Sequence, residues 1–518
     1  MKGFKSTEMP GRRRARVVPV WAAVFTGLAA SFPHANAGAR VIPVSLDWSD
    51  IASVSKTAVT IEVCVEPPLR RGHPIHDKLF AALHDLGAEY AHLQPYNIFP
   101  RLAVAELEPP VGGKTSWDFS AIDPIVADFM RATAGHPVVF NFGTLPAWIF
   151  QTQQPAAVPR DPDQVTWTYS EFNKAQVTAE AVRRAAAYQA RLASWYVTGG
   201  FTDELGHWHS SGHHYHIDYW EVLNDPDFED SLGPAEYTRL YDAIVSAVRR
   251  AAPGMKFMGP AVGDVAHAQF LAYFLNPAHH EPGIPIDMLS YHFFLIPDSD
   301  EPASVMPYTL FHEADGYLLS ADYIETLRRE FVPGAKTDVD DIATMLPDPL
   351  APKLAHPIPG SYWSLSGGVF AYLYGKLALL GVNAVGASEL IDSPGIVAAS
   401  TLVDWDTGRP NARYWVLKLL RENFGPGDRL VRPQPYTVLQ PDPTPQVYVQ
   451  GFVTAQGVRK ILLVNKRAAD EQLRIAGAAG GTVQTVDEYT TASSSPRRLE
   501  ADLLNLPALA VAVVTLGR

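Results

Sequence analysis

Short apolar runs alternate along most of the chain with longer segments in which apolar residues recur at helical spacing. Runs rich in branched and aromatic side chains predict buried strands, and a three-to-four spacing predicts helices packed on one face. The strand candidates are residues 57–64, 88–94, 137–143, 217–224, 256–260, 286–292, 334–340 and 382–390. Helix candidates lie between them, among them 75–87, 119–133, 172–197, 234–254 and 320–331.

This alternation predicts parallel strands that are covered by helices. Eight strand and helix pairs favour an α/β fold of the (β/α)₈ TIM barrel type, with insertions. A doubly wound open sheet is the alternative, but no glycine-rich fingerprint follows the first strand.

The pattern changes from about Leu430 onwards, where helical periodicity is missing. Short polar turns separate the apolar runs 446–454, 460–467, 482–489 and 508–517, which predict a C-terminal β-sandwich domain. The segment VIPVSLDW at 41–48 is a candidate for an additional strand of this sandwich, because both chain ends lie outside the barrel.

The first residues have the composition of an export signal. Four arginines at positions 12, 13, 14 and 16 precede an apolar run at 17–30, and Ala35-Asn36-Ala37 supplies small residues for cleavage. The apolar run is too short for a good spanning helix, so we expect no membrane anchor after signal removal and a secreted or periplasmic protein. The expected division is 1–37 signal peptide, 38–58 N-terminal segment, 59–428 barrel and 429–518 β-sandwich.

Charge and cysteine content narrow the class of partner. The net charge of -13 disfavours nucleic acid and anionic membranes, which require a basic face, and leaves small neutral or polymeric substrates open. Because Cys64 is the single cysteine, no internal disulfide can form. We expect no cofactor, since no phosphate loop, dinucleotide fingerprint or Gly-x-Ser-x-Gly motif is present.

The fourth strand candidate ends in polar residues. Tyr219–Leu223 reads as a buried strand that leads directly into Asn224 and Asp225. In a barrel, reacting groups project from the carboxyl ends of the strands, so we expect the Asp225 carboxyl to face the cavity. The alternative is an aspartate that caps the turn before Pro226.

Several segments together resemble clan A glycoside hydrolases. WEVLNDPD at 220–227 is similar to the strand-four motif of that clan, whose Asn-Glu-Pro carries the general acid/base. Within the clan the chain resembles family 39, the β-xylosidases and α-L-iduronidases. The segments that carry this resemblance are IDMLSYHFF at 286–294, TDVDDIATMLPD at 337–348, WDFSAIDPIV at 117–126 and LPAWI at 145–149.

The resemblance implies site residues, with two departures. It implies Asp225 as the acid/base, Asn224 as the partner of a sugar 2-hydroxyl, and Asp341 as the nucleophile. Both acids are aspartate where the family has glutamate, so each carboxyl is withdrawn by one methylene. Retaining enzymes hold the two carboxyls about 5 Å apart and inverting ones roughly 6.5–9.5 Å. We therefore expect inversion, deeper sugar binding, or lost activity.

Other acids compete for the nucleophile position. Asp341 stands with Asp338 and Asp340 in one short run, and a shift of one residue reverses which side chain faces the cavity. Asp340 is the direct competitor, and a solvated acid is the alternative for Asp341. Glu389, at the end of the eighth strand, is a further carboxyl that could substitute for a displaced nucleophile or form a buried ion pair.

Further contacts are expected around the acids. The resemblance implies that His292, at the end of strand six, contacts the substrate or positions the acid; the alternative is donation to a barrel carbonyl. Trp148 and Trp363 are candidates for sugar stacking, with a place in the core as the alternative. The residues His92, Arg101 and Lys336 could receive a uronate carboxylate or serve as structural partners.

The segment HWHSSGHHYH at 207–216 has spacings that permit metal ligation. It enters strand four from its amino end, so we expect it to lie away from the catalytic face and to hold no metal. The sequence thus predicts an exported glycoside hydrolase that acts on a carbohydrate with a carboxyl pair. The alternative is a catalytically inactive carbohydrate-binding barrel protein.

Overall fold

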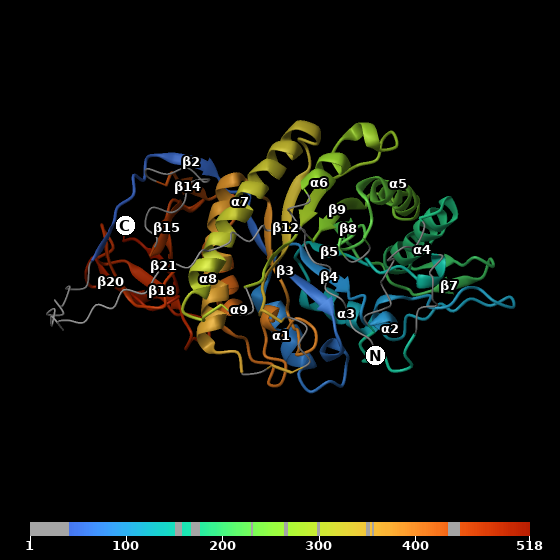
Figure 1. Cartoon of the computed structure of the whole chain (residues 1–518), viewed down its shortest axis with the longest axis horizontal. Helices are drawn as coiled ribbons and strands as arrows, with labels where there is room; N and C mark the ends of the chain where they lie inside the picture. Colours follow the sequence, from blue (N-terminus) through green and yellow to red (C-terminus); the bar gives the residue numbers. More distant parts are fainter. Residues whose placement is uncertain are drawn as a thin grey trace, which may run out of the picture. The chain divides into compact units, whose positions relative to one another are not determined.

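The computed structural model describes residues 41–150, 158–166, 177–228, 231–263, 268–297, 301–348, 353–354, 357–433 and 446–517 (Figure 1). The expected signal peptide at 1–37 lies outside these residues, as does the start of the helix expected from 172. Within the described part of the chain, no helix is long and apolar enough to cross a membrane.

Eight parallel strands form a closed barrel, as the alternation of apolar runs predicts. Each strand pairs in parallel with the next, and pairing of β13 with β3 and of β10 with β12 completes the circle. The barrel strands are β3 (Ala58–Val65), β4 (Ala91–Pro95), β5 (Val138–Phe140), β8 (Tyr219–Glu221), β9 (Lys256–Val262), β10 (Met288–Tyr291), β12 (Lys336–Thr344) and β13 (Ala384–Ala387). The seventh of these, β12, runs four residues beyond the expected end at Asp340.

Helices follow the barrel strands and surround them (Figure 1). Local signals fix several of their ends: the Thr178 side chain accepts from the Ala181 N–H at the start of α4, and Gly87 ends α1 in a left-handed conformation. The helices are α1 (His76–Leu86), α2 (Pro100–Ala103), α3 (Asp123–Ala132), α4 (Ala179–Val197), α5 (Pro234–Ala251), α6 (Ala268–Phe274), α7 (Met306–Phe331), α8 (Gly360–Leu380) and α9 (Ala412–Asn423).

Smaller elements decorate the barrel. They are the hairpin strands β6 (Gly200–Thr202) and β7 (Trp208–Ser210), the strand β11 (Phe293–Leu295) that pairs with β12, and the 3₁₀ turns η1 (Pro67–Leu69), η2 (Ala147–Ile149), η4 (Pro277–His279) and η5 (Ala398–Ser400).

Two sheets form the β-sandwich that follows the barrel. The larger sheet is antiparallel and contains β2 (Ile51–Val54), β14 (Arg429–Val431), β15 (Val447–Val453), β16 (Arg459–Asn465), β18 (Thr482–Val486), β19 (Arg497–Arg498) and β21 (Val511–Thr515). The smaller one contains β1 (Ile42–Val44), β17 (Glu471–Ile475) and β20 (Leu503–Leu506). Both sheets therefore take in a strand from the N-terminal segment.

The larger sheet is apolar on both faces, which explains its continuous hydrophobic runs. In β16, Ile461 and Leu463 pack in the core between the two sheets, while Leu462 and Val464 pack with the barrel helices. A hydrogen bond from Ser364 on α8 to the Leu509 carbonyl adds a polar contact to this packing. Most side chains of α8 are accordingly buried.

Candidate active site

The barrel interior changes from apolar to polar along the strands. Near their amino ends, Val139, Tyr219, Met258 and Met288 form a small apolar cluster. Inward positions closer to the carboxyl ends carry ionisable or polar groups. They are Glu62 on β3, His92 on β4, Glu221 on β8, Ser290 on β10, and Asp338 and Asp340 on β12, all buried. Alternation along each strand turns the apolar neighbours of these residues towards the helices.

The turn after β8 presents the Asp225 carboxyl at the carboxyl end of the barrel. Asp225 has a positive φ of 38°, and its N–H donates to the Ala261 carbonyl at 3.0 Å. Its carboxyl lies against Gly263, where an added Cβ would overlap it. The carboxyl faces His292 rather than capping the turn before Pro226, and 10% of the side chain is exposed.

Amides connect this carboxyl to the barrel interior. The Asn141 side-chain nitrogen donates to Glu221 Oε2 at 3.0 Å and to Asn224 Oδ1 at 3.2 Å. The Asn224 amide donates in turn to Asp225 Oδ2 at 3.4 Å. Asn224 is thus part of the polar wall beside Asp225.

A β-bulge in β12 brings both competing aspartates to the site. The pairing of β12 with β13 shifts between Val339 and Ile342, and an added Cβ on Gly386 would overlap the Asp340 carbonyl. Two consecutive residues therefore occupy one position of the ladder, and both carboxyls face inwards. The Asp340 side chain is 1% exposed and that of Asp341 is 9% exposed, so solvent reaches Asp341.

Glu62 and Ser388 support Asp341 from neighbouring strands. Burial, followed by the charge of Asp341, raises the pKa of Glu62 well above its ordinary value. Burial also raises the pKa of Asp341, while His292 and hydrogen bonds from Glu62 and Ser388 oppose the rise. Glu62 accordingly keeps its proton and donates it in a hydrogen bond to the Asp341 carboxylate.

His292 lies between the two exposed acids. Its Nδ1 atom is 2.9 Å from Asp225 Oδ1 and 4.0 Å from Asp341 Oδ2, and its Nε2 atom is 3.5 Å from Asp340 Oδ1. These distances are those of ion pairs, but the angles at the two nitrogens do not meet the criteria for hydrogen bonds. Burial lowers the pKa of His292, but Asp225 and Asp340 raise it by more, so the ring is an imidazolium.

The shared contact with His292 limits the separation of the acids. Asp225 Oδ1 and Asp341 Oδ2 both approach Nδ1, so they can be at most about 7 Å apart. This limit for the two oxygens accommodates the separation of about 5 Å found in retaining glycosidases and meets the lower end of the range of roughly 6.5–9.5 Å used by inverting ones.

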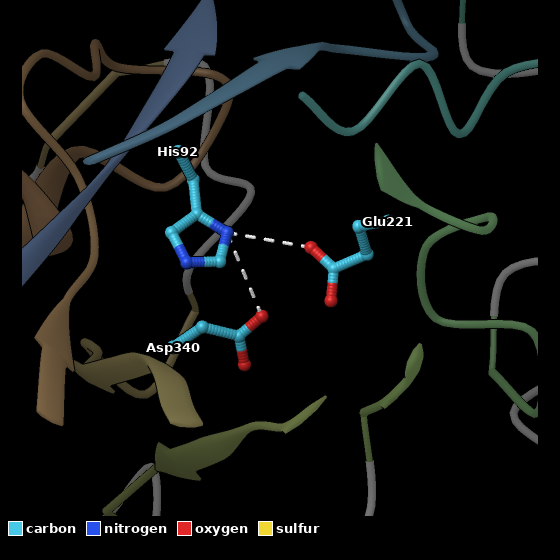
Figure 2. Close-up of side chains that lie close together, drawn as sticks. All are labelled: His92, Glu221 and Asp340. Carbon is cyan, nitrogen blue, oxygen red and sulfur yellow. Dashed lines mark ion pairs between the residues drawn. The ribbon is translucent and has the colours of Figure 1, made fainter. Parts of the chain in front are cut away.

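A second imidazole lies deeper in the barrel (Figure 2). His92 Nδ1 is 3.3 Å from Glu221 Oε2 and 3.8 Å from Asp340 Oδ2, and Nε2 is 3.2 Å from Asp338 Oδ2. Burial lowers its pKa, but Asp338 and Glu221 outweigh burial and raise the pKa to about 10. His92, Glu221 and Asp340 have the proximity of a metal site, and the raised pKa means that a proton would compete with a metal for the imidazole.

Glu389 joins a different group of acids. It is buried beside Glu66, which follows β3, and Asp392, and one oxygen from each lies within 4.8 Å of the others. Burial, followed by the charges of Asp392 and Asp341, raises the pKa of Glu389 well above its ordinary value. Glu389 thus stands in a cluster of carboxyl groups, with the Arg413 guanidinium as the nearby positive charge.

Trp148 and Trp363, the candidates for sugar stacking, have contacts that do not involve the acids of the site. Trp148, in η2, donates from Nε1 to the Glu106 carbonyl at 2.9 Å and lines a hollow of about 380 Å³ with Arg184. Trp363, in the first turn of α8, packs edge-on against Tyr362. Neither contact connects the rings to Asp225 or Asp341.

The remaining candidates also have local partners. Lys336 Nζ donates to the Tyr90 hydroxyl at 2.7 Å, and Arg101 donates to the Pro159 carbonyl. In the histidine-rich segment, His209 Nε2 lies 3.0 Å from Asp203, and His213 Nε2 lies 3.2 Å from Asp123. These contacts place the segment beside α3 and the β6–β7 hairpin, away from the acids of the barrel interior.

No family model matches the sequence, and no curated protein matches it. Solved structures do match. A GH39 β-xylosidase from Caulobacter crescentus has a TM-score of 0.55 at 15% identity, covering 93% of this chain and 100% of its own. A GH51 arabinofuranosidase from Xanthomonas axonopodis pv. citri has a TM-score of 0.59 at 12% identity, with 92% and 99% covered.

A GH30 endoxylanase from Clostridium papyrosolvens C71 gives a TM-score of 0.55 at 12% identity, with 92% of this chain and 100% of that chain covered. At such identities the likeness concerns the fold. The chain therefore shares its barrel and C-terminal sandwich with glycoside hydrolases that include a GH39 enzyme.

Proposed function

We propose that this protein is a glycoside hydrolase that cleaves O-glycosidic bonds of a saccharide or polysaccharide, with Asp225 as acid/base and Asp341 as nucleophile. The observation that carries the proposal is the difference in solvent exposure among the acids of the barrel interior. Among the acids around the two histidines, these two side chains keep solvent contact, at 10% and 9%, and both approach one nitrogen of His292. A sugar entering from the carboxyl ends of the strands would meet them first.

The geometry supports a retaining mechanism. In the first step the Asp341 carboxylate attacks the anomeric carbon while Asp225 passes a proton to the leaving oxygen, and the His292 imidazolium beside Asp225 supplies that proton. In the second step water attacks the anomeric carbon while Asp225 accepts its proton, and the bond from the sugar to Asp341 breaks to return the Asp341 carboxylate. A protonated Glu62 and the Ser388 hydroxyl would hold the Asp341 carboxylate in position before the first step and after the second.

The charges around the site favour a neutral sugar. Six carboxyl groups, from Glu62, Glu221, Asp225, Asp338, Asp340 and Asp341, surround the imidazoles of His92 and His292. With Glu62 and Asp340 protonated, the other four carboxylates still outnumber the two imidazolium charges. His92 and Lys336, which could have received a uronate, have partners of their own. A uronate would meet net negative charge, so neutral saccharides are the proposed substrates.

The test is hydrolysis of a panel of aryl glycosides and plant or bacterial polysaccharides, with NMR of the first sugar released. Asp341→Asn should be inactive on every substrate, while Asp225→Asn should keep activity on substrates whose leaving group needs no proton. Asp338→Asn is the matched control, because it makes the same change on β12 at a sealed position, and its activity is compared per folded molecule since Asp338 pairs with His92. Release of the inverted anomer, or equal loss in the control, would contradict the assignment.

A carbohydrate-binding protein without turnover is the second candidate. Both acids are one methylene shorter than the glutamates of the family 39 pattern, and the His292 ring occupies space between them. Saccharide binding by the wild type, measured by calorimetry, together with no hydrolysis over the whole panel would establish this candidate.

We also propose export to the periplasm or the medium. The support is the arginine-rich start, the apolar run at 17–30 and the small residues at 35–37. N-terminal sequencing of the mature protein tests the proposal, with a new terminus near residue 38 as the expected result.

A further inference from the structure

Three buried carboxyls meet where the first and the last barrel strands adjoin. Glu66 directly follows β3, and Glu389 and Asp392 follow β13, which pairs in parallel with β3. One oxygen of each carboxyl lies within 4.8 Å of the other two, and all three residues are at least nine-tenths buried. Such proximity of like charges away from water is unfavourable unless something neutralises them.

Glu66 is aimed into this group and, as a carboxylate, has no hydrogen-bond donor among the described residues. The residue is fully buried, and neither of its oxygens accepts a hydrogen bond there; the same holds for Oε2 of Glu389. Buried polar atoms are normally hydrogen-bonded, and an unpaired carboxylate is the costliest exception. These unpartnered oxygens point to a missing ligand that carries positive charge.

Asp392, in contrast, is held firmly by its surroundings. Its Oδ1 atom accepts the N–H groups of Ser393 at 2.7 Å and Val397 at 3.0 Å, and its Oδ2 atom accepts the Ser400 hydroxyl at 3.0 Å. Carboxylates that ligate metals are typically oriented by such outer hydrogen bonds. The fixed Asp392 and the unpartnered Glu66 together have the form of a prepared site.

We propose that Glu66, Glu389 and Asp392 bind a hard divalent cation, with calcium as the expected ion. All three donors are carboxylate oxygens, which is the donor set that calcium prefers. Oxygens bound to one calcium ion at about 2.3–2.6 Å lie no more than about 5 Å apart, and the three carboxyls satisfy this limit. Backbone carbonyls and water would complete the coordination.

Arg413 brings positive charge near Glu389 and Asp392 but makes no hydrogen bond to them among the described residues. Arg413 is buried, and its guanidinium donates to the carbonyls of Ser388 at 2.6 Å and of Ser400. Its hydrogen bonds go to the backbone that carries Glu389 and not to the three carboxyls. The competing explanation is a proton shared between Glu66 and Asp392, which are close enough for such a bond.

The proposal is independent of the glycosidase assignment and is tested by metal binding. The full chain is stripped with a chelator and titrated with CaCl₂ and, separately, MgCl₂ by calorimetry, and its Tm is followed. We expect one calcium ion per chain and a higher Tm with calcium. A response to MgCl₂ alone, or no binding of either ion at millimolar concentration, would overturn the calcium site.

Variants locate the site. Glu66→Gln and Asp392→Asn keep the side-chain shapes and should weaken calcium binding by more than about 10-fold. Glu325→Gln is the control, since Glu325 is an equally buried acid that has Arg328 as a partner, and it should bind calcium like the wild type. Unchanged binding in Glu66→Gln would contradict the assignment. If that variant does not fold, the wild-type titration still decides.

Discussion

The two buried histidines of the barrel have the same chemistry and different access to solvent. Each imidazolium contacts three carboxyls, and Asp340 touches both rings. The acids around His92 are sealed inside the barrel, whereas Asp225 and Asp341 beside His292 keep some exposure. A substrate can reach the cluster around His292, which is therefore available for catalysis. The sealed cluster around His92 supports the fold and holds the His292 cluster in place.

The largest expected effect is a loss of activity at the exposed cluster, which is His292 with Asp225 and Asp341. Asp341→Asn should lower kcat/KM by at least about 10⁴-fold, because the nucleophile is lost while its shape remains. The midpoint of urea unfolding should stay close to that of the wild type, since the side chain is at the solvent edge. Activity and unfolding measured on the same preparation check both statements, and a variant that unfolds much earlier would place Asp341 with the structural acids.

The sealed cluster should respond in the opposite way. His92→Gln removes the cation between Glu221 and Asp338, and we expect a loss of about 3–5 kcal/mol in the free energy of unfolding, because buried carboxylates then lack their partner. Urea unfolding measures the loss. His84→Gln, at an exposed histidine on α1, is a control that should cost less than about 1 kcal/mol. If both variants lose the same free energy of unfolding, His92 stabilises the fold no more than His84 does, and the sealed cluster has no special structural role.

Stability should also fall as the pH rises. The folded pKa of His92 is raised from 6.5 to about 10, so its contribution is complete below pH 6.5 and is lost as the pH increases towards 10. The pKa of Asp340 is raised from 3.8 to about 8, chiefly by burial, so between these pH values the folded form binds a proton that the unfolded form has released. Both shifts therefore lower the free energy of unfolding as the pH rises.

We therefore expect a lower free energy of unfolding at pH 9 than at pH 6, and a flatter dependence in His92→Gln over this interval. Urea unfolding at a series of pH values measures both curves. Stability that increases with pH in the wild type would show that His92 is neutral in the fold.

Sequence periodicity was sufficient for the barrel, because each strand is a separate apolar run and the closure follows from their number and order. It also places Asp225, Asn224 and His292 at strand ends, while their expected roles come from the resemblance to family 39. It could not choose between Asp340 and Asp341, since the β-bulge opposite Gly386 turns both inwards and a bulge is invisible in an apolar pattern.

Glu62 and Glu66, two buried acids at the first barrel strand, can be recognised from the sequence. In TIEVCVE at 60–66, polar or small residues alternate with branched ones, which places Thr60, Glu62, Cys64 and Glu66 on one side of β3. Burial of that polar side follows from the alternation once the strand belongs to a closed barrel. The meeting of Glu66 with Asp392 could not be predicted, because it depends on the closure between β3 and β13 and on the loop after β13.

The smallest expected effect concerns Glu62, which connects the exposed cluster to the sealed interior. Because Glu62 is protonated and donates to Asp341, Glu62→Gln replaces one neutral donor with another and should change kcat/KM by less than about 10-fold. Glu62→Leu removes the donor and should reduce kcat/KM more strongly and raise the lower pKa of the pH–rate profile, since the Asp341 carboxylate loses a hydrogen bond. If Glu62→Gln is as damaged as Glu62→Leu, Glu62 acts as a carboxylate, and the role of the nucleophile passes from Asp341 to a shared pair.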